Sequence, residues 1–326
     1  MLHPPGFWRR DGVVPRLLSP LSAITRALTA RRVAQPGWRA PVPVICCGNV
    51  TVGGAGKTTV ALDIGQRLIA QGWCVHFLLR GYGGTVRGPH RVGTGDTAAM
   101  VGDEALLLAA VAPTWVGADR AASARAASAG GAQVLVMDDG LQNSSLQQDV
   151  GLLVIDGATG FGNGRLLPAG PLREPVAAAV SRCAAAVLIG DDVRGVAAGL
   201  PIPLLRARLV AGAEVADLRG RRVVAFAGIA LPDKFFGMLR AGGIELADAV
   251  PFPDHHPYSE ADLARLIASG GGGMLVTTPK DAVRLPAAVR SGVRVVGVAL
   301  EWEPADALET FLRDRLQPRD VGGAQE

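Results

Sequence analysis

The sequence contains few lysines and few cysteines, and it lacks any long uninterrupted apolar run. The four cysteines contain no C-x-x-C pair, so they indicate neither a zinc site nor a disulfide framework, and they favour a reducing compartment. Nowhere do 18 apolar residues follow one another, and the N-terminus has no signal-peptide pattern. The sequence therefore predicts neither a membrane span nor export.

Lysine occurs only three times among the 33 basic residues, at Lys57, Lys234 and Lys280. Because arginine is the usual cation of this chain, each lysine is a candidate for a task that needs a compact point charge, such as binding a phosphate.

Positive charge is concentrated in residues 1–40, which contain seven arginines and a single acidic residue, Asp11, whereas the whole chain has a net charge of +4. Apolar residues at helical spacing lie among these arginines: Leu17, Leu18, Leu21, Ile24 and Leu28. Such a basic amphipathic arm suits an anionic membrane surface. The alternative is a helix packed on the protein with its arginines in water. Pro15 and Pro20 argue against one long helix.

Apolar runs alternate with helical patterns along most of the chain. Strands are expected at 42–49, 74–80, 134–140 and 151–157, and helices at 57–71 and 105–112. Continuously apolar strands are typical of a parallel sheet covered on both faces, so we expect a doubly wound α/β fold. We expect the arm 1–40, a larger domain 41–205 and a smaller α/β domain 206–326, with a frayed tail at 317–326.

The stretch VGGAGKTT lies between a predicted strand and a predicted helix. A phosphate-binding P-loop is written G-x-x-x-x-G-K-[ST], and here Thr51 replaces the first glycine. Backbone amides at a helix N-terminus bind phosphate, while Lys57 can reach the terminal phosphates and Thr58 can bind Mg²⁺. The predicted nucleotide-binding residues are Thr51, Val52, Gly53, Gly54, Ala55, Gly56, Lys57, Thr58 and Thr59. A glycine-rich turn with an incidental lysine is the alternative.

Further candidate residues carry carboxylate and imidazole groups. Asp138 and Asp139 end an apolar run, where a Walker B carboxylate would hold Mg²⁺, although Asp-Gly is also a hairpin-turn signal. Asp103 directly precedes an apolar helix and would be read as an N-cap on its own. His255 and His256 lie in FPDHHPYS without a further ligand at metal-site spacing, which excludes a zinc site there.

The motifs GNVTVGGAGKTT, LLRGYGG, VGDEALLLA, DDGLQN, VIDGATGFGNGRLLPAGPLREP, AFAGIALPDKFF, FPDHHPYS and TPKDAVRL occur in this order between about residues 41 and 285. In this combination the sequence resembles the tetraacyldisaccharide 4′-kinase family. The resemblance implies a P-loop NTPase-like domain plus a smaller α/β/α domain. It also implies ATP- and Mg²⁺-dependent phosphorylation of the 4′-hydroxyl of a lipid A disaccharide 1-phosphate by a monotopic enzyme at the cytoplasmic face of the bacterial inner membrane.

The resemblance also implies roles for individual residues. Asp103 would be the base, assisted by His255 or, alternatively, His256, and Lys57 would act on the transferred phosphate. The implied metal site comprises Thr58, Asp138, Asp139, Gln142 and Glu174, and the implied substrate contacts are Arg80 and Tyr82. Two positions depart from the family pattern, because Asn143 stands where a histidine is usual and Pro279 where a glutamate is usual.

Two rival functions fit parts of the sequence. A P-loop ATPase of the partition or metal-insertion type would use the nucleotide as a switch, but such proteins carry a second lysine where this chain has Val52. A non-enzymatic membrane-binding module would use the glycine loop only to hold an anionic head group. Nucleic-acid binding is not expected, since the basic charge is confined to one arm with little aromatic interleaving. No obligate protein partner is implied.

Overall fold

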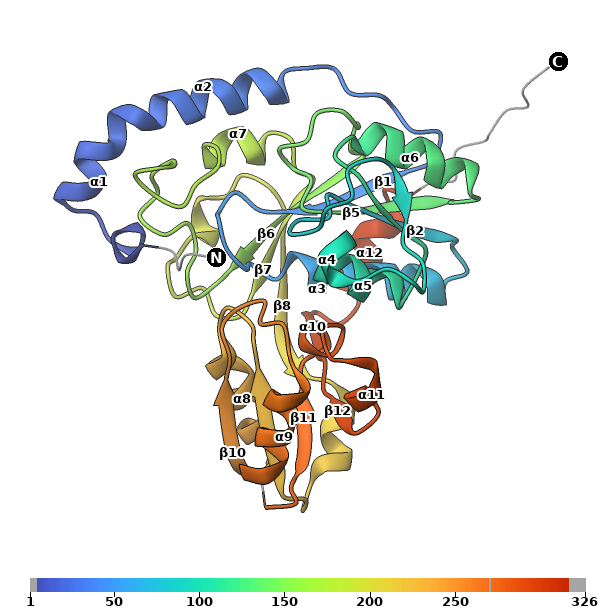
Figure 1. Cartoon of the computed structure of the whole chain (residues 1–326). Coiled ribbons are helices and arrows are strands. Elements are labelled where there is room, and N and C mark those ends of the chain that lie inside the picture. Colours follow the sequence, from blue (N-terminus) through green and yellow to red (C-terminus); the bar gives the residue numbers. More distant parts are fainter. Residues whose placement is uncertain (1–4, 270, 317–326) are drawn as a thin grey trace.

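The computed structural model describes residues 5–269 and 271–316 and forms two α/β bodies joined by two strands (Figure 1). The first four residues of the basic arm and the tail predicted to fray lie outside the described residues.

The larger body is built on a nine-stranded sheet with the order β13-β8-β7-β6-β1-β5-β2-β4-β3. Its central strands are parallel, and both edge strands, β3 and β13, pair antiparallel with their neighbours. The strands are β1 (Val44–Gly48), β2 (Val75–Leu79), β3 (His90–Arg91), β4 (Thr114–Val116), β5 (Val134–Asp138), β6 (Val150–Asp156), β7 (Ala185–Ile189), β8 (Leu204–Ala211) and β13 (Val298–Glu303). Every residue of β1, β2 and β5 is buried, which confirms the predicted parallel sheet.

Helices cover both faces of this sheet. One core cluster joins sheet residues such as Phe77 to α3 (Lys57–Ala70), α5 (Asp103–Ala109) and α12 (Ala307–Arg313). The cluster on the opposite face contains Met137 and packs against the remaining helices. These are α6 (Arg120–Ala129) and α7 (Val176–Val180), while the short α4 (Ala98–Val101) precedes α5. The arrangement is the expected doubly wound fold.

The smaller body has a four-stranded parallel sheet with the order β10-β9-β11-β12. Its strands are β9 (Val223–Ala227), β10 (Leu246–Pro251), β11 (Met274–Thr277) and β12 (Val293–Val295), and its helices are α8 (Pro232–Ala241), α9 (Glu260–Ser269), α10 (Pro279–Ala282) and α11 (Ala287–Arg290). Phe226 packs edge-on against Phe252 and Tyr258 in one of its two cores. The loops after β9, β10 and β11 carry the motifs at Gly228, His255 and Thr278.

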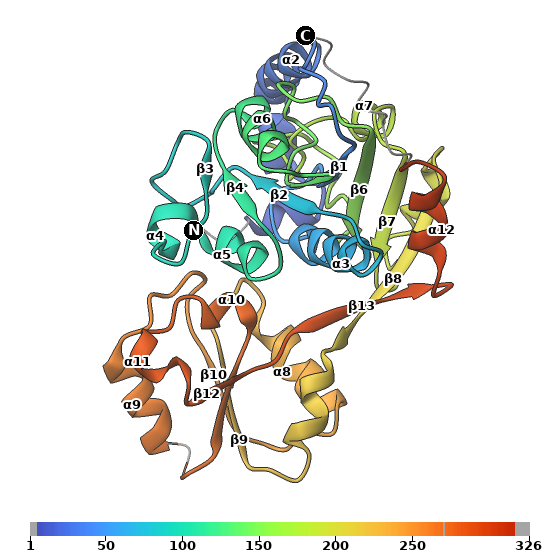
Figure 2. The ribbon, with the colours of Figure 1, turned by 90° about the vertical axis from the view of Figure 1, so that its right-hand side faces the viewer.

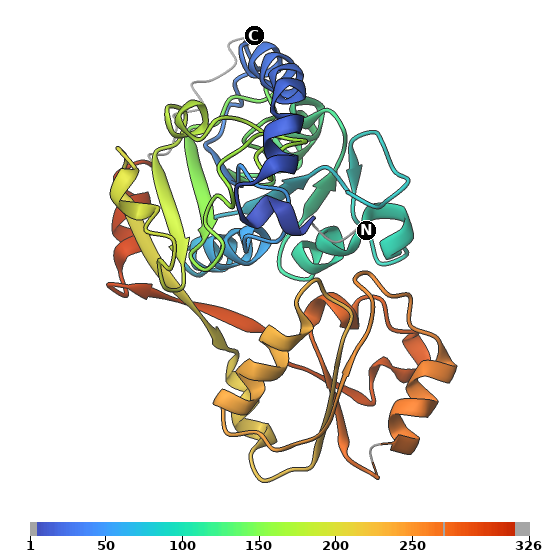
Figure 3. The same cartoon turned by 90° about the vertical axis from the view of Figure 1, so that its left-hand side faces the viewer.

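The C-terminal end of the described chain returns to the larger sheet. The sequence-based division, which places all of residues 206–326 in one smaller domain, does not include this return. β13 pairs with β8, and both strands run between the two bodies (Figures 2 and 3). Leu300 and Trp302 alternate with exposed residues on β13 and are buried in the larger core, where α12 also packs. The burial of these side chains explains the return.

The basic arm consists of short helices rather than one long helix, as Pro15 and Pro20 predict. They are η1 (Gly6–Arg9), α1 (Val13–Leu18), η2 (Ser19–Leu21) and α2 (Ser22–Val33). The arm lies along the outside of the larger body, remote from the smaller one (Figure 1). Over the described residues, no helix has the length and apolar character that crossing a bilayer requires.

Candidate active site

The glycine-rich loop connects the C-terminal end of β1 to the N-terminus of α3. Gly53 and Gly56 have φ angles of 123° and 85°, a region that disfavours residues with a side chain. A Cβ on Gly56 would also lie 2.7 Å from Cδ1 of Ile189. Because Gly56 is the N-cap residue of α3 and Lys57 the first residue of the helix, the amides of the loop meet the positive end of the helix dipole.

Thr51 is accommodated without the first glycine of the motif because the chain is extended at this point. Thr51 forms an isolated β-bridge with Leu172, and the Val52 amide donates to the carbonyl of Pro171 at 2.8 Å. The Arg173 amide donates in turn to the carbonyl of Val50 at 2.7 Å. The loop therefore begins on a short ladder with residues 171–173.

Asp138 lies at the C-terminal end of β5, beside β1, and contacts the P-loop helix. The Thr58 hydroxyl donates to Oδ2 of Asp138 at 2.7 Å. Oδ1 of Asp138 is buried and has no hydrogen-bond partner. Burial raises the pKa of Asp138 to about 6, although Lys57 and the Thr58 hydroxyl act in the opposite direction. Since β5 pairs in parallel with β1 and β2, the hairpin interpretation of Asp-Gly does not apply.

Asp139 follows with a left-handed backbone, φ 55°, and its carboxylate turns toward two cations. Nη1 of Arg173 donates to both of its oxygens, at 2.9 and 3.1 Å, and Nζ of Lys57 lies 3.9 Å from Oδ1. Burial alone would raise the pKa of Asp139, but the charges of Lys57 and Arg173 hold it below its ordinary value. Asp139 therefore keeps its negative charge beside Lys57.

These groups fit a magnesium ion bound together with nucleotide phosphates. Mg²⁺ in nucleotide sites is held by one or two protein oxygens, while phosphates and water complete its shell. The Thr58 hydroxyl and the unpartnered Oδ1 of Asp138 are suitable oxygens at the phosphate loop. Within the described part of the chain, no cluster of three or more His, Cys, Asp or Glu side chains is arranged to hold a metal alone.

Gln142 and Glu174, also predicted as metal ligands, are brought together by the structure but are engaged with other groups. Nε2 of Gln142 donates to Oε1 of Glu174 and to the carbonyl of Asn49, both at 2.9 Å. Nη2 of Arg182 donates to both oxygens of Glu174, at 2.9 and 2.8 Å. Glu174 is thus fully paired in a buried position, and its role as a ligand stays a prediction. Asn143, which replaces the usual histidine, accepts from Ser145 within its own turn.

Asp103 and His255 meet across the boundary between the two bodies. Nδ1 of His255 lies 2.7 Å from Oδ2 of Asp103. Asp103 is the first residue of α5, the N-cap is Gly102, and no side-chain capping bond is formed, so the N-cap interpretation does not hold. His256 instead contacts Asp262, with Nε2 at 3.2 Å from Oδ2. Of the two histidines, the structure places His255 at Asp103.

The two predicted substrate residues lie close to the start of α5. The backbone of the RGYGG loop packs so tightly on residues 100–102 that a Cβ on Gly84 would lie 2.5 Å from the carbonyl oxygen of Met100. Arg80 and Tyr82 of this loop have exposed side chains. Both are therefore available to a ligand that approaches Asp103.

Three arginines at or near the site are not predicted from the sequence. Arg182 pairs with Glu174, and Arg284 lies 3.2 Å from Oδ2 of Asp103. Arg120 is buried at the start of α6 with an unpartnered Nε, and burial lowers its pKa to about 10 despite the opposing charges of Asp139 and Asp138. Arg284 belongs to the quoted TPKDAVRL motif, but nothing in the composition distinguishes the three from the other arginines.

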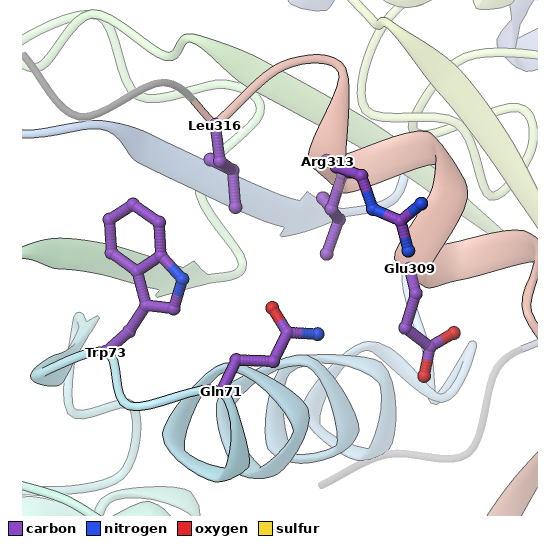
Figure 4. A pocket seen from close by; sticks show the side chains of 6 residues that line it. Gln71, Trp73, Glu309, Arg313 and Leu316 are labelled. Carbon is purple, nitrogen blue, oxygen red and sulfur yellow. The ribbon is translucent and has the colours of Figure 1, made fainter.

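A separate pocket of about 310 Å³ lies at the opposite end of α3 (Figure 4). It is lined by Gln71 and Trp73 beyond the helix and by Glu309, Leu312, Arg313 and Leu316 around α12. A 14-residue helix is about 20 Å long, so this pocket is far from the phosphate loop. It contains none of the predicted site residues.

The doubly wound sheet, the P-loop on α3 and the carboxylate at the end of β5 together define a P-loop nucleotide-binding protein. Residues 14–317 match the family model described as tetraacyldisaccharide-1-P 4′-kinase. The chain therefore belongs to the tetraacyldisaccharide 4′-kinase family, and it is a kinase of lipid A biosynthesis. The family assignment expected from the motifs is confirmed.

Relatives match over nearly their whole length. A tetraacyldisaccharide 4′-kinase of Gluconacetobacter diazotrophicus is 59% identical over 318 residues, which cover 95% of this chain and 97% of that protein. One from Paramagnetospirillum magneticum is 51% identical and covers 98% and 100%, respectively. A crystal structure of LpxK from Aquifex aeolicus in complex with ATP superposes with a TM-score of 0.76 at 25% identity, covering 94% of this chain and all of that one.

Proposed function

We propose that this kinase transfers the γ-phosphate of ATP to the 4′-hydroxyl of a tetraacyldisaccharide 1-phosphate through a site formed by both bodies. The observation that carries the proposal is the 2.7 Å contact between Asp103 and His255, which joins the smaller body to the body that carries the phosphate loop. The Aquifex aeolicus relative was crystallised with ATP, which supports ATP as the donor. The nucleotide-switch alternative is not favoured by the family match.

The phosphates of ATP would lie on the loop from Thr51 to Thr59. Its amides and the N-terminus of α3 bind the phosphate oxygens, and Lys57 places its charge on the β- and γ-phosphates. Thr58 and Asp138 would hold Mg²⁺, which neutralises charge on the phosphates during transfer. Lys57 exchanges its contact with Asp139 for the nucleotide, and Arg173 keeps the Asp139 carboxylate in place.

Asp103 would accept the proton of the 4′-hydroxyl as that oxygen attacks the γ-phosphorus. The new O–P bond forms, the bond from the γ-phosphorus to the bridging oxygen breaks, and ADP leaves. Burial would raise the pKa of Asp103, but the hydrogen bond from His255 and the charge of Arg284 hold it below its ordinary value. The base is therefore ionised near neutral pH. Arg80 and Tyr82 would contact the sugar phosphate.

Completion of the site by the smaller body predicts a low rate of ATP hydrolysis in the absence of lipid. Docking of His255 against Asp103 excludes water around the γ-phosphate, and the lipid hydroxyl is the intended acceptor. We expect phosphate release without lipid to be at least about 100-fold slower than lipid phosphorylation under the same conditions. Comparing the two rates with one batch of enzyme tests this. Equal rates would contradict a site that is completed around the lipid.

The arm would place the enzyme on the membrane that contains its substrate. Leu17 on α1 and Ile24 and Leu28 on α2 are 74%, 60% and 62% exposed. The arm is also attached to the larger body. Ser22 donates to the carbonyl of Leu166, and Thr29 donates to the carbonyl of Arg173, the residue that pairs with Asp139.

We propose that these exposed apolar side chains contact an anionic bilayer, because seven arginines lie in the same arm and the substrate is a lipid. ATP and Mg²⁺ would reach the site from the cytoplasm, so we assign the arm to the cytoplasmic face of the inner membrane as a peripheral protein.

Replacing Leu17, Ile24 and Leu28 together with serine is expected to weaken binding to vesicles of phosphatidylglycerol and phosphatidylethanolamine by at least about tenfold. Each side chain gains about 1.5 kcal/mol or more when it is fully buried, and all three lose this gain. Sedimentation with vesicles measures the effect. The matched control carries serine at Val193 and Ile267, which are 70% and 58% exposed but lie outside the arm. Equal binding by both variants would refute the membrane role of the arm.

A further inference from the structure

Arg284, just after α10, is one of the most completely buried and most highly bonded arginines of the smaller body. Its side chain is 5% exposed. Its guanidinium donates to three backbone carbonyls, those of Gly228 at 3.2 Å, His256 at 3.3 Å and Lys280 at 3.1 Å. These carbonyls belong to the loops after β9 and β10 and to α10. Arg284 thus fixes the loop that carries His255 to the other loops at the same edge of the small sheet.

The same guanidinium reaches into the larger body. Nε of Arg284 lies 3.2 Å from Oδ2 of Asp103, and this oxygen is also the one that contacts Nδ1 of His255 at 2.7 Å. Two groups of the smaller body therefore hold one oxygen of the carboxylate. Neither contact uses Oδ1, so the carboxylate is oriented by one oxygen while the other is the candidate acceptor for a proton.

A buried aspartate sets the direction of the guanidinium. Asp281 is fully buried, and its Oδ1 accepts from the Gly228 amide at 2.9 Å and from the Tyr258 hydroxyl at 2.8 Å. Nη2 of Arg284 lies 3.4 Å from the same oxygen. Asp281 is itself held by these donors. The guanidinium of Arg284 therefore lies between two carboxylates, that of Asp281 in the smaller body and that of Asp103 in the larger body.

Among the described residues, two other ion pairs cross the boundary without reaching Asp103. Lys280 pairs with Glu104 at 3.1 Å and Lys234 with Asp156 at 3.0 Å, and all four side chains are at least 17% exposed. Exposed pairs of this kind contribute little, whereas removal of one partner from a buried pair leaves a buried charge unsatisfied. Besides the contact of His255, the ion pair of Arg284 with Asp103 is therefore the cross-boundary pair whose loss should affect the base.

We propose that Arg284 is a positioning residue for phosphate transfer: it orients Asp103 and keeps it ionised, and it does so only while the smaller body is docked. The inference rests on the proposed role of Asp103 as the base. It adds a reason for the use of two bodies, because the groups that hold the base in place come from the smaller body.

The charges around Asp103 determine the sign of the expected pH effect. His255, Arg284 and Lys280 face it from the smaller body and favour the carboxylate, whereas Glu104 on α5 and Asp254 and Asp281 beyond the boundary carry negative charge. Burial raises the pKa of Asp103 and the positive charge of Arg284 lowers it, so removing that charge should raise the pKa. A base with a higher pKa is protonated over a wider acid range, and activity is then lost at a higher pH.

The test compares Arg284→Gln and Arg284→Lys with the unchanged chain in lipid phosphorylation from labelled ATP, with kcat and KM measured across pH. For Arg284→Gln we expect kcat to fall by about 10- to 100-fold and the KM for ATP to stay within about threefold, since the phosphate loop is not touched. The acid limb of kcat should move up by about one pH unit. Arg284→Lys retains the charge, so its acid limb should stay near that of the unchanged chain while kcat falls less.

Matched variants separate a positioning role from a general loss of structure. Lys234→Met breaks another cross-boundary pair and should leave the acid limb in place. Adding Arg284→Gln to Asp103→Asn should reduce kcat no further than Asp103→Asn alone. The inference would be overturned if the acid limb of the kcat profile of Arg284→Gln did not move. It would also be overturned if the acid limb of Arg284→Lys moved up by the same amount. The lysine variant therefore still tests the inference if the glutamine variant does not fold. If Asp103→Asn keeps full activity, the assignment of the base fails instead.

Discussion

Lys57→Met is expected to reduce phosphate transfer to the lipid by at least about 10³-fold. Lys57 begins α3 on the phosphate loop and is the cation that can move from Asp139, 3.9 Å away, to the transferred phosphate. Methionine keeps the length and apolar stem of the side chain but removes the charge. Preorganised cations and donors at a reacting phosphate or oxyanion contribute about 10²- to 10⁵-fold to the rate. Incorporation of label from γ-labelled ATP into the lipid measures the loss.

Lys280→Met is the matched control for this prediction, because it removes one of the two remaining lysines and an ion pair at the boundary without touching the phosphate loop. We expect it to lose far less activity than Lys57→Met. The account of the phosphate site would be wrong if the two variants lost activity equally, or if Lys57→Met retained a tenth or more of the rate while still folded.

Asp103→Asn is expected to lower kcat by about 10²- to 10⁴-fold, the range that a positioned general base contributes. Asparagine preserves the shape of the side chain, and its carbonyl oxygen can still accept a hydrogen bond from His255, whereas the ion pair with Arg284 is lost. The amide cannot take up the proton of the attacking hydroxyl. The KM for ATP should change little, because Asp103 is not part of the phosphate loop.

Glu104→Gln provides the control for this substitution. Glu104 is the adjacent acid on α5 and pairs with Lys280 at a partly exposed position. Its neutralisation removes a comparable charge from the same helix turn, and we expect only a small change in kcat. Steady-state kinetics of the two variants, supported by thermal unfolding of each, distinguish the roles. Comparable losses in both would show that charge near α5, rather than Asp103 itself, is what matters.

The continuous apolar runs were sufficient to predict the parallel sheet, because strands buried on both faces leave a strong local signal. The C-terminal return was not predicted. β13 is an edge strand whose alternating pattern, with Leu300 and Trp302 buried, resembles that of many strands, and its partner β8 lies about 90 residues earlier in the chain. Such non-local pairing is determined by packing that a single sequence does not display.

At the site, too, local motifs were predictable from the sequence, whereas contacts between distant segments were not. The loop from Thr51 to Thr59 was predictable because phosphate binding needs glycines and a lysine in a fixed local order. The choice between His255 and His256 was not, since it depends on which imidazole the smaller body directs toward Asp103. Arg284 was missed for the same reason: in a chain rich in arginine, only the fold reveals which guanidinium lies beside a buried carboxylate.

The most direct test of this account is a crystal structure with a non-hydrolysable ATP analogue, Mg²⁺ and the tetraacyldisaccharide 1-phosphate. The account predicts the terminal phosphate on the amides of the Thr51 to Thr59 loop, Nζ of Lys57 on its oxygens, and the 4′-hydroxyl within hydrogen-bond distance of Asp103. A terminal phosphate bound elsewhere, or a 4′-hydroxyl that is directed away from Asp103 while the loop is filled, would contradict it.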